Sequence, residues 1–156
     1  MIFITTPFSF AAVDRLKELK VPAIKIGSGE CNNYPLIEHI CRFKKPIILS
    51  TGMNDIKSIK KAVSIFEKNK INFALMHTTN LYPTPSNLIR LNALNEMKRA
   101  FPGVPLGLSD HTGDNFTSFA AIAMGVSLIE KHYVDKKTRL GVDIPASIDF
   151  HQLKEL

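Results

Sequence analysis

Short apolar segments rich in β-branched residues alternate along the chain with longer segments in which apolar residues recur at the helical period. The short segments predict strands, because β-branched side chains favour extended backbone. Six strands are predicted, at Ile2–Thr6, Ala23–Gly27, Pro46–Ser50, Phe73–His77, Pro105–Ser109 and Leu128–Tyr133. Strands that alternate with helical segments in this way are typical of parallel β/α units.

Each segment between the predicted strands carries one apolar stripe, which predicts an amphipathic helix. Asn54 is the predicted N-cap of one helix, and Ser147 is the predicted N-cap of a last short helix. The apolar stripes are Val13, Leu16 and Leu19; Ile56, Ile59, Val63 and Phe66; Leu94, Met97 and Phe101; Phe116, Phe119, Ile122 and Ala123; and Phe150 and Leu153. No linker interrupts this pattern, so we expect residues 1–156 to form one domain.

Small and polar residues cluster at the carboxyl end of nearly every predicted strand. The clusters are Thr5–Thr6, Lys25–Glu30, Ser50–Gly52, His77–Asn80, Ser109–His111 and Glu130–His132. In a parallel barrel all carboxyl ends open on one face, whereas a doubly wound sheet concentrates its chemistry at one or two loops. The predicted fold class is therefore α/β, as a partial (β/α)8 TIM barrel.

Composition narrows the class of protein. The chain has 45% hydrophobic and 22% charged residues, and no apolar run reaches the length of a membrane span. No secretion signal is recognisable at Met1, so we expect a cytoplasmic protein. The two cysteines are too few for a disulfide framework. The net charge of +6 comes from scattered lysines, which argues against nucleic-acid binding and favours small anionic ligands.

Two histidines fall on the polar faces of neighbouring strands. Period-two alternation puts Ser109 and His111 on one face of their strand, and Glu130 and His132 on one face of the next. If both faces point into the barrel mouth, His111 and His132 can share a divalent metal and leave positions open for substrate. The alternative is that each histidine only forms hydrogen bonds in a polar core. His77 is a less favoured third ligand.

Lys25 lies within an apolar strand, where an ammonium group needs an anion to neutralise it. A substrate phosphate or carboxylate fits this need, and a salt bridge with Glu30 or Glu130 is the alternative. The turns Gly27–Gly29 and Ser50–Gly52 add backbone and hydroxyl donors after two successive strands. Together they predict a site lined with neutral donors around one cation, which suits a phosphate ester.

Five segments resemble, in order and spacing, the motifs of the N-acetylneuraminate (sialic acid) synthase family. They are Lys25–Leu36, Leu49–Met53, Thr79–Pro85, Gly107–Thr112 and Ile129–His132. The resemblance covers essentially the whole chain, and the form of the first segment looks nearer to N-acetylneuraminate synthases than to the pseudaminic or legionaminic acid branches. It implies an enzyme that condenses phosphoenolpyruvate with N-acetylmannosamine to form N-acetylneuraminate and phosphate.

The resemblance also implies residue roles. Its catalytic positions correspond to Lys25, Glu30 and His132, and a divalent ion, Mn²⁺ or Mg²⁺, would be held by His111 and His132. Phosphoenolpyruvate would be contacted by Thr6, Lys25, Ser28, Ser50, Asn80 and Ser109. The amino sugar would be contacted by Tyr82 and Asp143, although the loop Lys137–Asp143 departs from the family pattern.

Two other functions remain open at this stage. One is a synthase of the pseudaminic or legionaminic acid type, or one that uses a phosphorylated sugar. The other is an inactive barrel fragment, because the family barrel has eight strands and those present resemble strands three to eight. The first two strands and a C-terminal antifreeze-like domain would be missing from residues 1–156. The resemblance implies a homodimer in the full-length form. Because two strand edges would be exposed, we expect residues 1–156 alone to be poorly soluble or oligomeric, with little activity.

Overall fold

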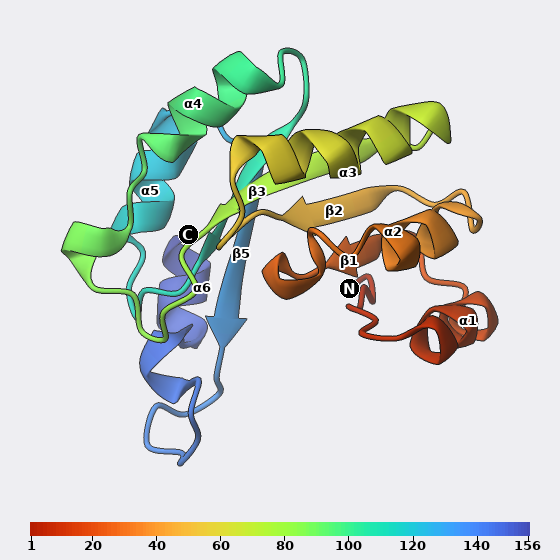
Figure 1. The fold of residues 1–156 in the computed structure, drawn as a ribbon. Coiled ribbons are helices and arrows are strands. Elements are labelled where there is room, and N and C mark those ends of the chain that lie inside the picture. Colours follow the sequence, from red (N-terminus) through yellow and green to blue (C-terminus); the bar gives the residue numbers. More distant parts are fainter. The chain divides into compact units, whose positions relative to one another are not determined.

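The computed structural model describes all residues from Met1 to Leu156, and helices alternate with strands along the chain (Figure 1). The chain divides into two compact units, Met1–Leu75 and Met76–Leu156. The boundary lies inside strand β3, which spans Phe73–Thr78. Each unit is described by itself. None of the helices combines the length and apolar character that a membrane crossing requires.

The first unit contains two parallel strands and three α-helices. The strands are β1 (Ile24–Ile26) and β2 (Ile47–Ser50), and Lys25 of β1 lies opposite Ile48 of β2. The helices are α1 (Phe10–Leu19), α2 (Tyr34–Cys41) and α3 (Ile56–Lys68), with the short 3₁₀ helix η1 (Ser28–Glu30) after β1. Helix α2 packs against both α1 and α3.

The predicted strand at Ile2–Thr6 is wrong. Only Thr5 pairs, as an isolated parallel bridge to Ile24, and Ile2 and Phe3 are exposed. A strand requires a neighbouring backbone over several residues, and β1 offers one only at Thr5. Sequence analysis also overlooked helix α2, although Asn33 caps it and Pro35 lies in its first turn, both of which are helix-start signals.

The predicted N-cap of α3 is displaced by one residue. Asp55 caps the helix, since its carboxylate accepts a hydrogen bond from the backbone N–H of Ser58 at 2.7 Å. The Asn54 amide instead donates to the backbone carbonyls of Ser28 at 2.9 Å and Gly52 at 2.6 Å. Asn54 therefore joins two turns rather than starting a helix.

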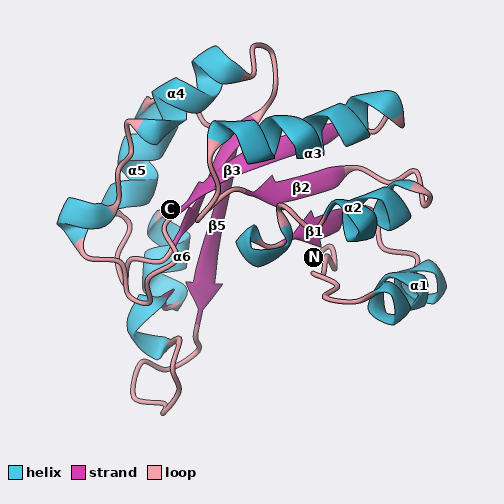
Figure 2. Ribbon diagram, viewed as in Figure 1, coloured by secondary structure: helices cyan, strands magenta, loops and turns pink.

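The second unit contains three consecutive parallel strands and three α-helices. Figure 2 colours helices cyan and strands magenta. The strands are β4 (Leu106–Asp110), β5 (Leu128–Tyr133) and β6 (Ser147–Ile148). The helices are α4 (Ala93–Ala100), α5 (Phe116–Ala123) and α6 (Phe150–Glu155), with 3₁₀ helices η2 (Ser86–Leu88) and η3 (Ile144–Ala146). Leu94 of α4, Leu108 of β4 and Ala121 of α5 form a small apolar core between strand and helices.

Two helix predictions in this unit need correction. Ser147 does not cap the last helix, because it lies in β6, and Asp149 caps α6 through a reciprocal capping box with Gln152. The apolar stripe of α5 faces outward, with Phe116 79% exposed, while the helix buries its small residues Ser118 and Ala121. Close approach of α5 to β4 favours small side chains at the contact. Helix α6 likewise exposes Phe150 and Leu153.

The tight contact between β4 and β5 gives a testable prediction. A Cβ added at Gly107 would lie 2.8 Å from both the carbonyl oxygen and the Cβ of Leu128, and 3.0 Å from the Cε of Met76. We expect Gly107→Ala to lower the free energy of unfolding by about 1–3 kcal/mol through overpacking. The control is Gly29→Ala, where nothing lies within 4 Å. Urea unfolding followed by circular dichroism measures both, and equal changes would contradict the prediction.

Candidate functional site

In the first unit, the polar turns after β1 and β2 are joined by hydrogen bonds. Ser28 is buried, and its hydroxyl accepts from the backbone N–H of Gly52 at 3.1 Å. The Asn54 amide adds its bond to the Ser28 carbonyl. The two turns that the sequence placed at successive strand ends therefore lie side by side, and the carboxyl ends of β1 and β2 form a single polar surface.

Three further predicted site residues belong to this surface. Lys25 is half-buried in β1, between the buried Ile24 and Ile26. Glu30 is half-buried at the end of η1, where its carboxylate accepts a hydrogen bond from the Asn33 amide at 2.6 Å. Ser50 ends β2 at 2% exposure, and its hydroxyl is buried without a hydrogen-bond partner. A buried hydroxyl without a partner is costly, so this atom is suited to contact a ligand. Thr6 is half-buried and directly follows Thr5, which pairs with Ile24.

In the second unit, three aromatic rings cluster at the carboxyl ends of β4 and β5. The ring centroids of His111 and His132 are 5.4 Å apart. The Tyr82 ring stacks on His111 at 4.0 Å with an interplanar angle of 25°, and it meets His132 edge-on at 5.4 Å. The Tyr82–Pro83 peptide bond is cis. The structure thus brings together the two histidines and the tyrosine that the sequence singled out.

Hydrogen bonds across the two strands show that the polar side chains share a face. The Ser109 hydroxyl donates to Glu130 Oε1 at 2.6 Å and lies 3.4 Å from His111 Nε2. Ser109 and Glu130 are register partners in the parallel pair. Period-two alternation therefore predicted this face correctly.

The protonation state of His111 is set by its surroundings. Its Nδ1 lies 2.7 Å from the carbonyl oxygen of Thr79, and because a carbonyl only accepts, Nδ1 carries the proton and Nε2 keeps its lone pair. Burial lowers the pKa of His111, against the opposing effect of the Thr79 hydrogen bond. Burial thus favours the neutral imidazole of His111, which is the form that binds metal ions.

The two histidines fit a divalent ion, although no group of three or more histidine, cysteine, aspartate or glutamate residues surrounds such a site. The ring separation of 5.4 Å suits two imidazoles that share one ion. The remaining ligands would then be oxygen atoms of water and substrate. Asp143 lies beside this position, with Oδ2 3.8 Å from His132 Nδ1. Burial raises the pKa of Tyr82, and the nearby carboxylates of Asp143 and Glu130 raise it further.

Two other predicted residues lie around the end of β3. Asn80 is half-buried, and its amide oxygen is buried without a hydrogen-bond partner. His77 is buried, and its Nε2 lies 2.8 Å from the carbonyl oxygen of Ile89. This bond engages His77 with the backbone, and nothing in the structure supports it as a third metal ligand.

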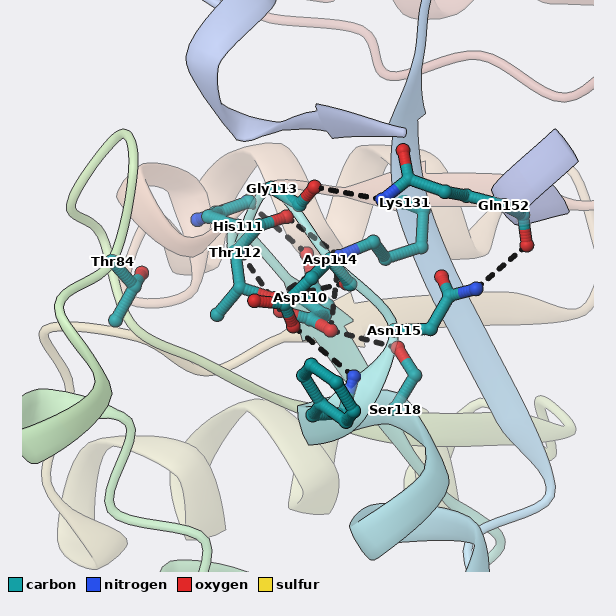
Figure 3. A network of polar contacts seen from close by, with 12 residues as sticks. Thr84, Asp110, His111, Thr112, Gly113, Asp114, Asn115, Ser118, Lys131 and Gln152 are labelled. Carbon is teal, nitrogen blue, oxygen red and sulfur yellow. Dashed lines mark hydrogen bonds and ion pairs between the residues drawn. The ribbon is translucent and has the colours of Figure 1, made fainter. Parts of the chain in front are cut away.

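Sequence analysis did not identify a buried ion pair between the residues that precede the two histidines. Figure 3 shows its members, Asp110 and Lys131, together with His111. Lys131 Nζ is 3.0 Å from Asp110 Oδ2, and the two side chains are 4% and 1% exposed. Burial lowers the pKa of Lys131, and the neighbouring Asp110 carboxylate opposes that shift. A signal was present in the sequence, because alternation places Asp110 and Lys131 together on the face opposite the histidines.

His77 gives a prediction about pH. Burial lowers its pKa, the Ile89 hydrogen bond opposes this, and Arg90 adds to it. The unfolded chain therefore takes up this proton at a higher pH than the native chain. The contribution of His77 to stability is complete above its ordinary pKa of about 6.5 and is lost as the pH falls through the lowered native pKa.

His77→Gln keeps a donor for Ile89 but cannot titrate. We expect its unfolding free energy to fall less steeply with decreasing pH, by at most ~1.4 kcal/mol per pH unit. Urea unfolding between about pH 5 and 7 measures these slopes. The control is His151→Gln on exposed helix α6, which should keep the wild-type slope. A wild-type slope in His77→Gln would contradict the prediction.

Comparisons with known proteins identify the family. The model of the NeuB family matches residues 1–156. The N,N'-diacetyllegionaminic acid synthase of Campylobacter jejuni is 41% identical over 157 residues, which cover 99% of this chain and 47% of that protein. The N-acetylneuraminate-9-phosphate synthase of Homo sapiens is 34% identical over 145 residues, which cover 93% of this chain and 40% of that protein. The chain thus spans less than half the length of these two relatives.

A solved structure supports the same assignment. The N-acetylneuraminic acid synthetase of Leptospira borgpetersenii matches with a TM-score of 0.95 and 34% sequence identity, over 99% of this chain and 54% of that one. This similarity confirms the predicted α/β class. Together with the match over residues 1–156, it shows that the chain belongs to the NeuB family.

Proposed function

We propose that this chain carries the catalytic face of a synthase that condenses phosphoenolpyruvate with N-acetylmannosamine to form N-acetylneuraminate and phosphate. The observation that carries the proposal is the pairing of His111 with His132 beside Tyr82, in a chain of the NeuB family. The proposed enzyme is cytoplasmic and homodimeric in its full-length form. Its partners are small molecules rather than nucleic acid or membrane.

The proposed phosphoenolpyruvate site combines one cation with neutral donors. Lys25, half-buried in β1, would supply the positive charge that attracts the phosphate or carboxylate. Two atoms without a partner support the proposal, namely the Ser50 hydroxyl and the Asn80 amide oxygen. The complete proposed set is Thr6, Lys25, Ser28, Ser50, Asn80 and Ser109.

His111 and His132 would hold a divalent ion, Mn²⁺ or Mg²⁺. When bound, such an ion polarises the aldehyde of the open-chain sugar as a Lewis acid. Tyr82 and Asp143 lie next to the histidines and would bind the amino sugar there. The Thr79 carbonyl orients His111 by fixing its tautomer, and such supporting hydrogen bonds commonly determine metal affinity.

The proposed reaction forms one C–C bond and breaks one C–O bond. C3 of phosphoenolpyruvate attacks the aldehyde carbon, and water adds to C2, where positive charge develops. The C2–O bond to phosphate then breaks, which releases phosphate and leaves the 2-keto acid. Lys25 would orient the anionic reactant, and oriented reactants can gain on the order of 7–11 kcal/mol. Glu30, held by Asn33, would hold or transfer a proton beside the reacting carbons.

A synthase of the legionaminic acid type is the second candidate. The observation that favours it is the 41% identity to the Campylobacter jejuni enzyme, against 34% to the Homo sapiens enzyme. The two candidates share the phosphoenolpyruvate and metal sites and differ in the acceptor sugar. Phosphate release with a panel of N-acetylated amino sugars distinguishes them, since turnover with only a diacetylated acceptor would favour the second.

The metal site is testable by binding as well as by turnover. We expect Mn²⁺ to raise the melting temperature of the chain and phosphoenolpyruvate to raise it further, because ligands that bind the native state stabilise it by about 2.7 kcal/mol at 100 times Kd. His111→Ala and His132→Ala should abolish the Mn²⁺ effect. His151→Ala, on the exposed face of α6, is the matched control and should keep it. Equal stabilisation of all four proteins would refute the site.

Ser50→Ala separates binding from stability. Removing a buried hydroxyl that has no partner should leave the free energy of unfolding unchanged or raise it. The same change should weaken phosphoenolpyruvate binding, measured by calorimetry, by about tenfold, the worth of one hydrogen bond to a charged ligand.

The contrasting variant is Ser118→Ala, whose hydroxyl donates to Asp110 at 2.7 Å. It should lower stability by about 1–3 kcal/mol because a buried carboxylate loses a donor. Wild-type phosphoenolpyruvate affinity in Ser50→Ala would argue against the proposed role of Ser50.

A further inference from the structure

The buried ion pair lies directly behind the histidine pair, on the other face of the same two strands. Asp110 and Lys131 are register partners in the parallel pairing of β4 with β5. Each immediately precedes one of the histidines in sequence. Because successive side chains of a strand point to opposite faces, the ion pair and the histidines are mounted on adjacent positions of the same backbone.

Both members of the ion pair form further hydrogen bonds besides the contact with each other. Asp110 Oδ1 accepts from the backbone N–H and the hydroxyl of Thr112, at 2.9 and 2.8 Å. Asp110 Oδ2 accepts from the Ser118 hydroxyl of α5 at 2.7 Å. Lys131 Nζ donates to the carbonyls of Thr112 and Asp114, at 2.7 and 2.8 Å. These bonds converge on the segment Asp110–Asp114 (Figure 3).

The bonds hold His111 from both neighbouring residues. Asp110 precedes it and Thr112 follows it, and Lys131 contacts both. Lys131 in turn precedes His132. Lys131, the residue before His132, thus contacts the residues on both sides of His111. A shift of one strand along the other would break these bonds and would turn every side chain to the opposite face.

Stability alone does not account for such a pair. Removing two charges from water is costly, and apolar residues in the same place commonly give an equally stable fold. A fully hydrogen-bonded buried pair fixes the orientation of the groups that it joins better than an apolar contact does. Its hydrogen bonds form in only one arrangement.

We infer that Asp110 and Lys131 form a positioning pair, which sets the spacing and orientation of His111 and His132 for one divalent ion. This inference rests on the proposed metal site. It assigns a role to residues that touch neither the ion nor the substrates, and whose effect passes through the backbone of β4 and β5. Supporting residues behind metal ligands typically change metal affinity by about 10–100-fold when mutated.

The test separates folding from positioning. Asp110→Asn and Lys131→Met should each lower the melting temperature strongly, because each leaves one buried charge without its partner. The double variant Asp110→Asn/Lys131→Met has no buried charge, and its asparagine still accepts from Thr112. We expect it to recover most of the lost melting temperature. Its Mn²⁺ dissociation constant, measured by electron paramagnetic resonance, should remain about 10–100-fold weaker than that of the wild type.

A control of comparable instability lies in the core. Leu94→Ala removes a buried side chain of the small apolar core that it forms with Leu108 and Ala121. It should lower the melting temperature and leave the Mn²⁺ dissociation constant of the folded protein unchanged. A second, metal-free readout is the nitrogen NMR spectrum of His111, which should show one tautomer in the wild type and in Leu94→Ala, and a mixture in the double variant.

The outcomes distinguish this inference from the proposed function. If the wild type does not bind Mn²⁺, the proposed metal site fails and the inference fails with it. If the wild type binds and the folded double variant binds equally well, only the inference is overturned. If the double variant does not fold, the Mn²⁺ affinities of Thr112→Val and Lys131→Arg test the inference instead. Each of these changes alters the hydrogen bonds around His111 more mildly. Wild-type affinity in both would overturn the inference, and weakened affinity in both would support it.

Discussion

The parallel pairing of β4 with β5 is the constraint on which the candidate site depends. One face of the pair carries Ser109, Glu130 and the two imidazoles, and the other carries Asp110 and Lys131. Because the side-chain period of a strand is two, neither face can move without the other. Gly107 allows the two strands to approach closely at the start of this register, where a Cβ would collide with Leu128. The geometry of the site is therefore a property of the strand pairing more than of any single loop.

The buried ion pair and two of the predicted phosphoenolpyruvate positions differ in how completely their polar groups are hydrogen-bonded. Behind the histidines, Asp110 and Lys131 bond to one another, to α5 and to the following loop. At the predicted phosphoenolpyruvate positions, the Ser50 hydroxyl and the Asn80 amide oxygen are buried without partners. A fully bonded network rigidifies, whereas an unbonded buried atom is costly unless a ligand contacts it. Polar groups thus rigidify the chain at the ion pair, whereas at Ser50 and Asn80 they are available to bind a ligand.

Sequence alone predicted the parts of this structure that depend on local pattern. Alternation correctly placed Ser109 with His111 on one face, and five of the six predicted strands correspond to β1–β5. The errors arise where contacts with residues distant in sequence determine the local structure. Asn54 and Asp55 are equally good N-caps by residue type, and the carbonyls of Ser28 and Gly52 recruit Asn54 away from the helix.

The outward stripe of α5 shows the same limit, because periodicity reveals that Phe116 and Phe119 share a face but not which face packs on β4. The ion pair was overlooked for a related reason. Alternation put Asp110 and Lys131 on one side, but only the register shows that they are opposite one another. Residue spacing within a strand is local information, whereas the pairing of strands belongs to the tertiary structure.

If the proposed function holds, acceptor choice is the property that this site leaves most open to change. Except for Thr6 and Asn80, the positions proposed for phosphoenolpyruvate and metal lie on strands, directly after a strand, or in turns joined by hydrogen bonds. Asp143, proposed for the amino sugar, is exposed in a loop, and its backbone carbonyl is held by Ser147 while its side chain remains about half exposed. Loops on a rigid scaffold tolerate change more readily than the strands that carry them. A change of acceptor sugar would accordingly alter this loop before it altered the strands.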